Sequence, residues 1–288
     1  MSEGLDRRVH AWRPDLADAA LEGRAEAGRY VRGETRRVSA AQAPIRGKPD
    51  AAAGMETEAL RGEAATVFET TENGFAWVQL QGDSYVGYIE AASLGAPDPA
   101  PTHRVSAVRT PVFSRPDIKS PPLALLPLNA MVSVVGEAED RNARYALLAS
   151  GGAVVAQHLA ASGAFEEDFV AVAERFMEAP YLWGGKTALG LDCSGLVQTA
   201  LAACGMAAPR DTDMQETTLG SPADPAGGFR RGDLLFWKGH VAIATGPGEI
   251  VHANARSMRV NRDPADQAIA RLAGRGLPLT ALRRLRQA

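Results

Sequence analysis

A capped helix followed by three short strands is the feature that most constrains the fold of this 288-residue chain. Asp192 stands at an N-cap position, and apolar residues then recur at helical spacing until Gly205, a typical helix stop. Three strand-like runs come next, joined by short glycine-containing turns: 233–237, 240–244 and 249–253. Because short turns join antiparallel neighbours, this region predicts an α+β domain with a helix preceding an antiparallel sheet.

Two strand-rich stretches precede this helix. Between residues 35 and 96, and again between 102 and 160, short β-type runs alternate with turn residues, and the first stretch contains Asn-Gly and Gly-Asp pairs. A segment rich in proline and alanine, 95–101, separates the two stretches. We therefore predict two small SH3-like β-barrels, over residues 35–96 and 102–160, in front of an α+β domain over residues 161–288.

Residues 1–34 form a lead-in to these stretches. They include an alanine- and glutamate-rich segment, in which Pro14 and Asp15 occupy positions typical of a helix start. The sequence predicts a helical lead-in here rather than a separate domain.

Composition narrows the range of partners. Hydrophobic residues make up 45% of the chain and charged residues 23%, as in folded globular proteins. The net charge is −3 and the lysines and arginines are scattered, so no nucleic-acid partner is expected. No apolar run approaches the roughly 18 residues needed to cross a bilayer, and no signal-type segment is present. If the sequence is full length, we expect a cytoplasmic protein with no membrane partner.

The two cysteines, Cys193 and Cys204, need separate explanations. They lie eleven residues apart in the predicted helix, a separation of about 16 Å, which is too far for a disulfide. No cluster of residues has the spacing of metal ligands, so neither a metal nor another cofactor is expected. We interpret Cys204 as a packing residue, since an isolated cysteine on an apolar helix is usually part of the core.

Cys193 stands where a catalytic nucleophile would be effective. The start of a helix and a neighbouring imidazole both lower the pKa of a thiol, so we expect that of Cys193 to be low. His240 opens the middle strand and His252 lies in the next one, and antiparallel pairing can bring both rings to one side of the sheet. This pattern predicts a Cys-His-His triad for acyl transfer, with His240 as base and His252 as the group that orients it. Backbone amides at the helix start are expected to stabilise the oxyanion.

Five blocks of this region resemble the NlpC/P60 family of cell-wall cysteine peptidases. They occur in the family's order: APYLWGGK at 179–186, LDCSGLV at 191–197, GDLLFW at 232–237, HVAI at 240–243 and IVHA at 250–253. The resemblance covers about residues 165–260, and the preceding stretches look like the bacterial SH3-type domains that accompany this domain in one subfamily. It implies a papain-like fold and hydrolysis of the γ-D-glutamyl bond to a diamino acid in peptidoglycan stem peptides.

The resemblance also implies roles for individual residues of this domain. It makes Cys193, His240 and His252 the catalytic residues, and it places Tyr181, Trp183, Asp192 and Ser194 at the substrate subsites. Asp192 would suit a substrate ammonium group, and Tyr181 the oxyanion or acyl side.

In the subfamily with SH3-type domains, the first barrel closes one end of the cleft, so the substrate needs a free N-terminal L-Ala. The implied substrate is a muropeptide containing L-Ala-γ-D-Glu and a diamino acid. Glu63 and Tyr85 lie in segments similar to the corresponding barrel segments, so the resemblance places them near the substrate amine.

Other interpretations remain open. The same chemistry could act on intact peptidoglycan outside the membrane, or the chain could be a wall-binding protein with a degenerate catalytic domain. A transferase or amidase is also compatible, because the triad determines the acyl-enzyme and not its acceptor. Tyr181 and Trp183 could be core aromatics, His252 a structural strand residue, and Asp192 only a helix cap. The polar residues Asp211, Asp213 and Gln215 are predicted to lie on a loop, without a role in the chemistry.

Overall fold

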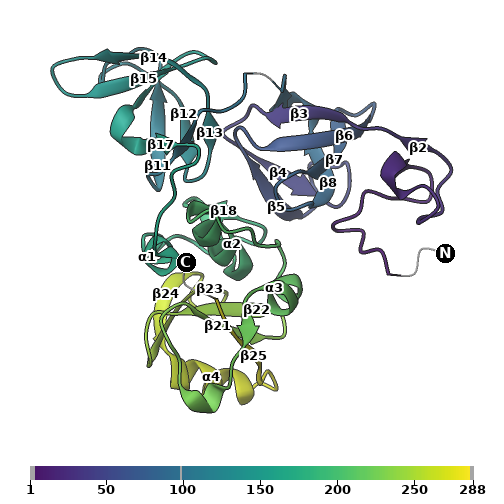
Figure 1. Cartoon of the computed structure of the whole chain (residues 1–288), viewed down its shortest axis with the longest axis vertical. Coiled ribbons are helices and arrows are strands. Elements are labelled where there is room, and N and C mark those ends of the chain that lie inside the picture. Colours follow the sequence, from purple (N-terminus) through teal and green to yellow (C-terminus); the bar gives the residue numbers. More distant parts are fainter. Residues whose placement is uncertain (1–3, 98, 286–288) are drawn as a thin grey trace. The chain divides into compact units, whose positions relative to one another are not determined.

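The computed structural model describes residues 4–97 and 99–285. The chain divides into two compact units, Met1–Ser162 and Gly163–Ala288. Figure 1 traces the chain through both units. None of the helices in the described residues is long and apolar enough to span a membrane.

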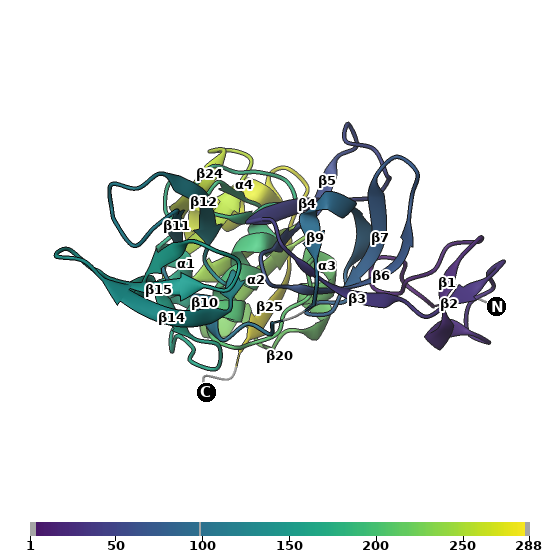
Figure 2. The same ribbon diagram turned by 90° about the horizontal axis from the view of Figure 1, so that it is seen from above.

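The first unit begins with a small parallel pair of strands. Strand β1 (Ala17–Asp18) pairs with β2 (Tyr30–Val31), and the two lie side by side in Figure 2. A single 3₁₀ turn, η1 (Ala19–Leu21), connects them, and the carboxylate of Asp18 caps it by accepting a hydrogen bond from the amide of Ala20.

The predicted helix beginning at Pro14 and Asp15 is wrong. The backbone of Arg13 pairs with that of Leu16 through two reciprocal hydrogen bonds, which close a tight turn around Pro14 and Asp15. A helix starting here would need the carbonyl oxygens of Arg13 and Leu16 to accept from amides four residues further along the chain. Helical structure begins only after Asp18, where that side chain supplies a cap.

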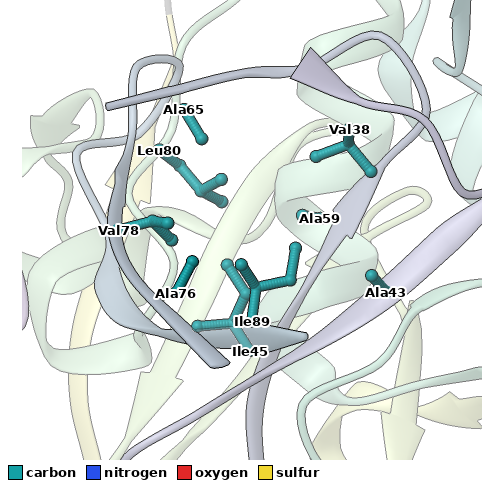
Figure 3. Close-up of a cluster of buried hydrophobic side chains, with 9 residues drawn as sticks. All are labelled: Val38, Ala43, Ile45, Ala59, Ala65, Ala76, Val78, Leu80 and Ile89. Atoms are coloured by element: carbon teal, nitrogen blue, oxygen red, sulfur yellow. The ribbon is translucent and has the colours of Figure 1, made fainter. Parts of the chain in front are cut away.

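A seven-stranded sheet follows, in the order β5-β4-β8-β7-β6-β3-β9. Its strands are β3 (Glu34–Val38), β4 (Gln42–Arg46), β5 (Met55–Leu60), β6 (Ala64–Thr70), β7 (Phe75–Leu80), β8 (Val86–Glu90) and β9 (Leu94–Gly95), with the 3₁₀ turn η2 (Ala91–Ser93) before the last. Alternate residues of these strands, including Ile45 and Ile89, point into one apolar cluster (Figure 3). The strands predicted in this stretch are confirmed.

The second strand-rich stretch contains two sheets. A three-stranded sheet consists of β10 (His103–Val105), β13 (Met131–Val132) and β17 (Leu159–Ala161). A five-stranded sheet consists of β11 (Arg109–Phe113), β12 (Pro122–Pro127), β14 (Val134–Glu139), β15 (Arg144–Leu148) and β16 (Ala153–Val155), and the 3₁₀ turn η3 (Ala156–His158) follows it. Leu126 and Val154 belong to a separate apolar cluster of this stretch. The β structure predicted here is confirmed.

The second unit combines helices with a six-stranded antiparallel sheet, in the order β20-β25-β21-β22-β23-β24. Its helices are α1 (Phe169–Glu174), α2 (Cys193–Ala203), α3 (Thr212–Thr218) and α4 (Ala265–Ala273), with the 3₁₀ turn η4 (Pro225–Gly227). Its strands are β18 (Lys186–Thr187), β19 (Gly190–Leu191), β20 (Ser221–Pro222), β21 (Asp233–Trp237), β22 (His240–Ala244), β23 (Glu249–Asn254), β24 (Arg259–Pro264) and β25 (Leu279–Arg284). The predicted helix and the three strands that follow it are confirmed.

Helix α2 is the buried centre of this unit. Ten of its eleven residues are buried, so it is enclosed on all sides rather than only along one stripe. It lies with α1 on one side of the sheet, and α4 lies on the other side (Figure 1). Asp192 caps its start by accepting a hydrogen bond from the amide of Gly195, and Gly205 follows its end with a φ of 74°. Both signals predicted for the helix ends are therefore confirmed.

The start of α2 packs against backbone, which leaves no room for a side chain at Gly195. A Cβ atom there would lie 2.1 Å from the carbonyl oxygen of Gly185. The segment before the helix can therefore approach the first turn closely enough to hold it in place.

We expect Gly195→Ala to lower the free energy of unfolding by about 3 kcal/mol, because the added methyl group must displace backbone rather than a flexible side chain. Gly248→Ala is the matched control, since a Cβ atom at that glycine meets open space. Its expected change is within about 0.5 kcal/mol. Urea unfolding of both variants measures the difference, and equal stabilities would contradict the close contact.

Candidate active site

Cys193 is the first residue of α2 and is 7% exposed. Its sulfur lies 3.8 Å from the hydroxyl oxygen of Thr212, and the backbone amides of Val241 and Ser194 also hydrogen bond to it. Val241 directly follows His240 in strand β22. The thiol therefore lies against the beginning of the strand that carries the predicted base.

Burial raises the pKa of the Cys193 thiol, and the negative charge of Asp192 raises it further. The amides of Val241 and Ser194 and the Thr212 hydroxyl act in the opposite direction, but burial is the largest cause. The expected low pKa is therefore wrong for the resting site, because a thiolate enclosed in protein loses its solvation. The thiol starts protonated and needs a base to remove its proton.

His240 and His252 form a hydrogen-bonded pair on adjacent strands. The register that pairs Ile243 with Val251 places His252 opposite Ala242, so the two histidines are diagonal neighbours on one face. Nε2 of His240 lies 2.9 Å from Nδ1 of His252, and the ring centroids are 5.1 Å apart. The predicted contact between the two rings is confirmed.

Both imidazoles are neutral at neutral pH. Burial, with smaller contributions from the neighbouring His252 and Arg271, lowers the pKa of His240 to about 3. Burial also lowers the pKa of His252 to about 4, against the opposing effect of Asp263. A neutral imidazole has one protonated and one bare nitrogen. The contact between the rings uses one nitrogen of each and holds a single proton, so the second nitrogen of each ring can meet a different group. A neutral His240 can act as a base.

A buried ion pair holds the turn in front of the nucleophile. Oδ2 of Asp192 lies 2.6 Å from the guanidinium of Arg210, whose side chain is 1% exposed. Asp192 also accepts hydrogen bonds from the amides of Gly184 and Gly195 and from the hydroxyl of Ser194. The cap role of Asp192 is confirmed. Its binding of a substrate ammonium stays a prediction, and Arg210 already balances its charge.

The polar residues after Arg210 belong to a helix, so the predicted loop is wrong. Helix α3 begins at Thr212, directly after its N-cap residue Asp211. Gln215 is fully buried in this helix, and its amide nitrogen donates to the carbonyl oxygen of Ser194 at 3.0 Å. That bond ties α3 to the first turn of α2, and the tie keeps the Thr212 hydroxyl near the thiol.

Tyr181 and Trp183 precede the nucleophile and differ in their surroundings. Burial, with smaller contributions from the nearby Cys193 and Asp192, raises the pKa of Tyr181 to about 12, so the phenol stays protonated and can donate. Trp183 is 65% exposed, which excludes the interpretation of this residue as a core aromatic. Leu189, at 57% exposed, adds to the apolar surface of this segment. Their contacts with substrate stay predictions.

Glu63 and Tyr85 lie in the first unit. Glu63 stands between β5 and β6, and its backbone pairs with Leu60 and Val38. Tyr85 is 4% exposed and directly precedes β8. Binding of the substrate amine by these two residues stays a prediction.

Sequence reasoning missed Arg210 and Thr212. An arginine beside a proline and an aspartate is typical of an exposed turn, and a threonine at a helix start is common at many sites. Neither residue has a local signal that distinguishes it. Among the described residues, no group of three or more His, Cys, Asp or Glu side chains could hold a metal ion.

Replacing Arg210 by methionine should lower the free energy of unfolding by about 3–5 kcal/mol, because it leaves the buried Asp192 carboxylate without its counter-ion. Arg259→Met is the matched control, since Arg259 and its partner Glu178 are 51% and 62% exposed. Its expected loss is below about 1 kcal/mol. Chemical denaturation of both variants tests this, and similar losses would count against a buried ion pair at the site.

The histidine pair also predicts how stability depends on pH. Both pKa values are lower in the folded chain than the ordinary value of 6.5, so between pH 6.5 and about 4 the unfolded chain binds protons that the folded chain does not. Stability should therefore fall as the pH drops through this window, by up to about 1.4 kcal/mol per pH unit for each histidine.

The contribution of the pair can be isolated with the double variant His240→Asn, His252→Asn. Urea unfolding at pH 7 and at about pH 4.5 should show a larger loss for the original chain than for the variant, since other groups titrate equally in both. Losses of the same size would show that the two rings keep ordinary pKa values.

Comparison with known proteins identifies two regions of the chain. Residues 178–272 match the NlpC/P60 family, and residues 45–94 match the bacterial dipeptidyl-peptidase Sh3 domain. The second match lies within the first strand-rich stretch. That residues 102–160 form another SH3-type domain stays a prediction.

Two curated relatives carry related names. Dipeptidyl-peptidase 6 of Lysinibacillus sphaericus is 28% identical over 251 residues, which cover 80% of this chain and 91% of that protein. The γ-D-glutamyl-L-lysine dipeptidyl-peptidase of Bacillus subtilis is 36% identical over 96 residues, which cover 30% of this chain and 31% of that protein. The match thus spans less than a third of the second relative.

A solved structure of an NlpC/P60 family protein from Bacillus cereus has a TM-score of 0.70 with 20% identity, covering 87% of this chain and 99% of that one. An NlpC/P60 endopeptidase from Photobacterium damselae has a TM-score of 0.58 with 12% identity, covering 87% of this chain and 71% of the other. These likenesses support the fold. Residues 178–272 thus carry a domain of the NlpC/P60 family of cysteine peptidases, and a bacterial dipeptidyl-peptidase Sh3 domain precedes it at residues 45–94.

Proposed function

We propose that this chain hydrolyses the γ-D-glutamyl bond to a diamino acid in peptidoglycan-derived peptides that have a free N-terminal L-Ala. Its relatives are named dipeptidyl-peptidase 6 and γ-D-glutamyl-L-lysine dipeptidyl-peptidase, which supports hydrolysis of peptidoglycan peptides. The observation that carries the proposal is the protonated Cys193 thiol at the start of α2, beside the strand of a neutral, hydrogen-bonded histidine pair.

In the proposed reaction, the bare nitrogen of His240 takes the proton of the Cys193 thiol as the sulfur attacks the γ-carbonyl carbon. Amides at the start of α2 stabilise the oxyanion, and the protonated phenol of Tyr181 is available as a further donor. Collapse of the intermediate breaks the C–N bond, and the imidazolium of His240 gives its proton to the departing amine. Water then resolves the thioester, with His240 again acting as base.

His252 keeps His240 in place through the 2.9 Å contact between their rings. This contact limits rotation of the His240 ring and occupies its Nε2, so Nδ1 is the nitrogen left to act as the base. In this proposal Cys193 and His240 are the catalytic residues and His252 orients the base.

The amine requirement is assigned to the Sh3 domain, with Glu63 and Tyr85 as the residues that would meet the substrate ammonium. The family match over residues 45–94 supports this assignment, because it contains both residues and its family is named after dipeptidyl-peptidases. A peptidase with this requirement acts on peptides already released from the wall, so we further propose a role in cell-wall recycling in the cytoplasm. Cell fractionation tests this location.

The reaction is tested with L-Ala-γ-D-Glu-meso-diaminopimelate and with its L-Lys counterpart, with release of L-Ala-γ-D-Glu followed by mass spectrometry. Cys193→Ala should reduce turnover by at least about 10³-fold, because the nucleophile is lost. Cys204→Ala, which changes the other cysteine at the far end of α2, should keep ordinary turnover. Undiminished turnover by Cys193→Ala would refute the mechanism.

N-acetylation of the L-Ala tests the amine requirement separately. The acetylated peptide should be cleaved much more slowly, since it has no ammonium group. Equal cleavage, or release of peptides from intact wall, would favour a hydrolase of the polymer. If no peptide is cleaved and only binding is seen, the wall-binding interpretation would gain support.

A further inference from the structure

Asp263 lies beside His252, on the side of that ring opposite to His240, so His240, His252 and Asp263 follow one another in a line. Strand β24 pairs with β23 so that His252 lies opposite Asn261, and Asp263 is two residues further on the same face. Oδ2 of Asp263 lies 3.5 Å from Nε2 of His252. His252 thus has His240 at its Nδ1 and a carboxylate at its Nε2.

Two neighbours hold the Asp263 carboxylate in this position. Arg271 of α4 forms an ion pair with Oδ2, and the side-chain amide nitrogen of Asn261 donates a hydrogen bond to Oδ1 at 3.1 Å. The side chain of Asp263 is only 12% exposed, so solvent competes weakly for it. Within the described residues, Asp263 and Arg271 are the charged groups that act on the two rings. The carboxylate is therefore fixed before the reaction starts.

The Nε2 atom of His252 has no other hydrogen-bond partner in the described part of the chain, and its side chain is 2% exposed. A separation of 3.5 Å is long for a hydrogen bond, and such contacts often shorten when substrate binds. A carboxylate can only accept, so it stabilises the tautomer of His252 with its proton on Nε2. Nδ1 of His252 is then bare and accepts a hydrogen bond from Nε2–H of His240.

We propose that Asp263, held by Arg271, is the positioning residue that fixes the direction of the hydrogen bonds along this line and so leaves Nδ1 of His240 bare. Without the carboxylate, the opposite arrangement becomes available, in which His252 donates from Nδ1 and His240 carries its proton on Nδ1. That form of His240 has no free lone pair with which to take the thiol proton. The inference rests on the proposed function, since it concerns the base of that reaction.

The proton count follows directly from this arrangement. The thiol proton of Cys193 moves to Nδ1 of His240, which becomes an imidazolium hydrogen-bonded through Nε2 to His252. Asp263 takes up no proton in these steps, and its carboxylate stabilises the positive charge that develops on the pair. The same proton later leaves with the amine, so no group beyond those named has to gain or lose one.

The first test uses the unaltered chain. Nitrogen-15 NMR of the histidine rings near neutral pH should show His240 and His252 both protonated on Nε2. A proton on Nδ1 of His252 would overturn the proposal, whatever the behaviour of any variant.

The second test is Asp263→Asn, which keeps the shape of the side chain but adds a donor group. We expect kcat to fall by about 10²–10⁴-fold with little change in KM, because a wrong tautomer removes the base and not the binding site. NMR should show the proton of His240 moving to Nδ1, and alkylation of Cys193 by iodoacetamide should slow in parallel. A purely structural role for Asp263 would not change the tautomer.

Glu249→Gln is the matched control, since it removes a carboxylate on strand β23 that pairs with Arg262 instead. It should leave the tautomers and the turnover unchanged. If Cys193→Ala remains active, the proposed function fails. If Cys193→Ala is inactive while Asp263→Asn keeps the original tautomers and turnover, only this inference is wrong.

Discussion

The buried carboxylate of Asp192 joins the elements that form the site. It caps α2, binds the amide of Gly184 in the preceding turn, and pairs with Arg210 from the segment that leads into α3. Each of these bonds lies where water is largely excluded, so the loss of any one would leave a polar group unpaired at considerable cost. These bonds also fix the position of Cys193, because it directly follows Asp192 in the chain.

Burial determines the chemistry of the resting site more than any single neighbour does. It raises the pKa of the Cys193 thiol and lowers that of both His240 and His252. All three groups are therefore neutral before substrate arrives, and charge separation occurs only during the reaction. An enclosed, neutral site of this kind depends strongly on the tautomer of its base, because a neutral imidazole can carry its proton on either nitrogen and only one form leaves a lone pair for the thiol proton. This dependence gives the chain of contacts from His240 to Asp263 its importance.

Much of the catalytic unit could be predicted from local signals. The cap at Asp192, the glycine after α2 and the turns between β21, β22 and β23 each act over a few residues, and all were placed correctly. One incorrect prediction, the helix in the N-terminal lead-in, arises where two local signals compete. In the lead-in, Pro14 and Asp15 suit a helix start and also a tight turn, and backbone pairing between Arg13 and Leu16 selected the turn.

The sequence by itself determined the capped helix α2, the three strands after it, the resemblance to the NlpC/P60 family and the contact between His240 and His252, because these depend on residue type and spacing. Only the tertiary structure decided that Arg210 neutralises Asp192, that α3 places Thr212 beside the thiol, and that Asp263 faces His252. It also decided the direction of the pKa shift at Cys193. Such properties depend on how much solvent is excluded and on residues distant in the chain, and neither can be read from the local pattern of residues.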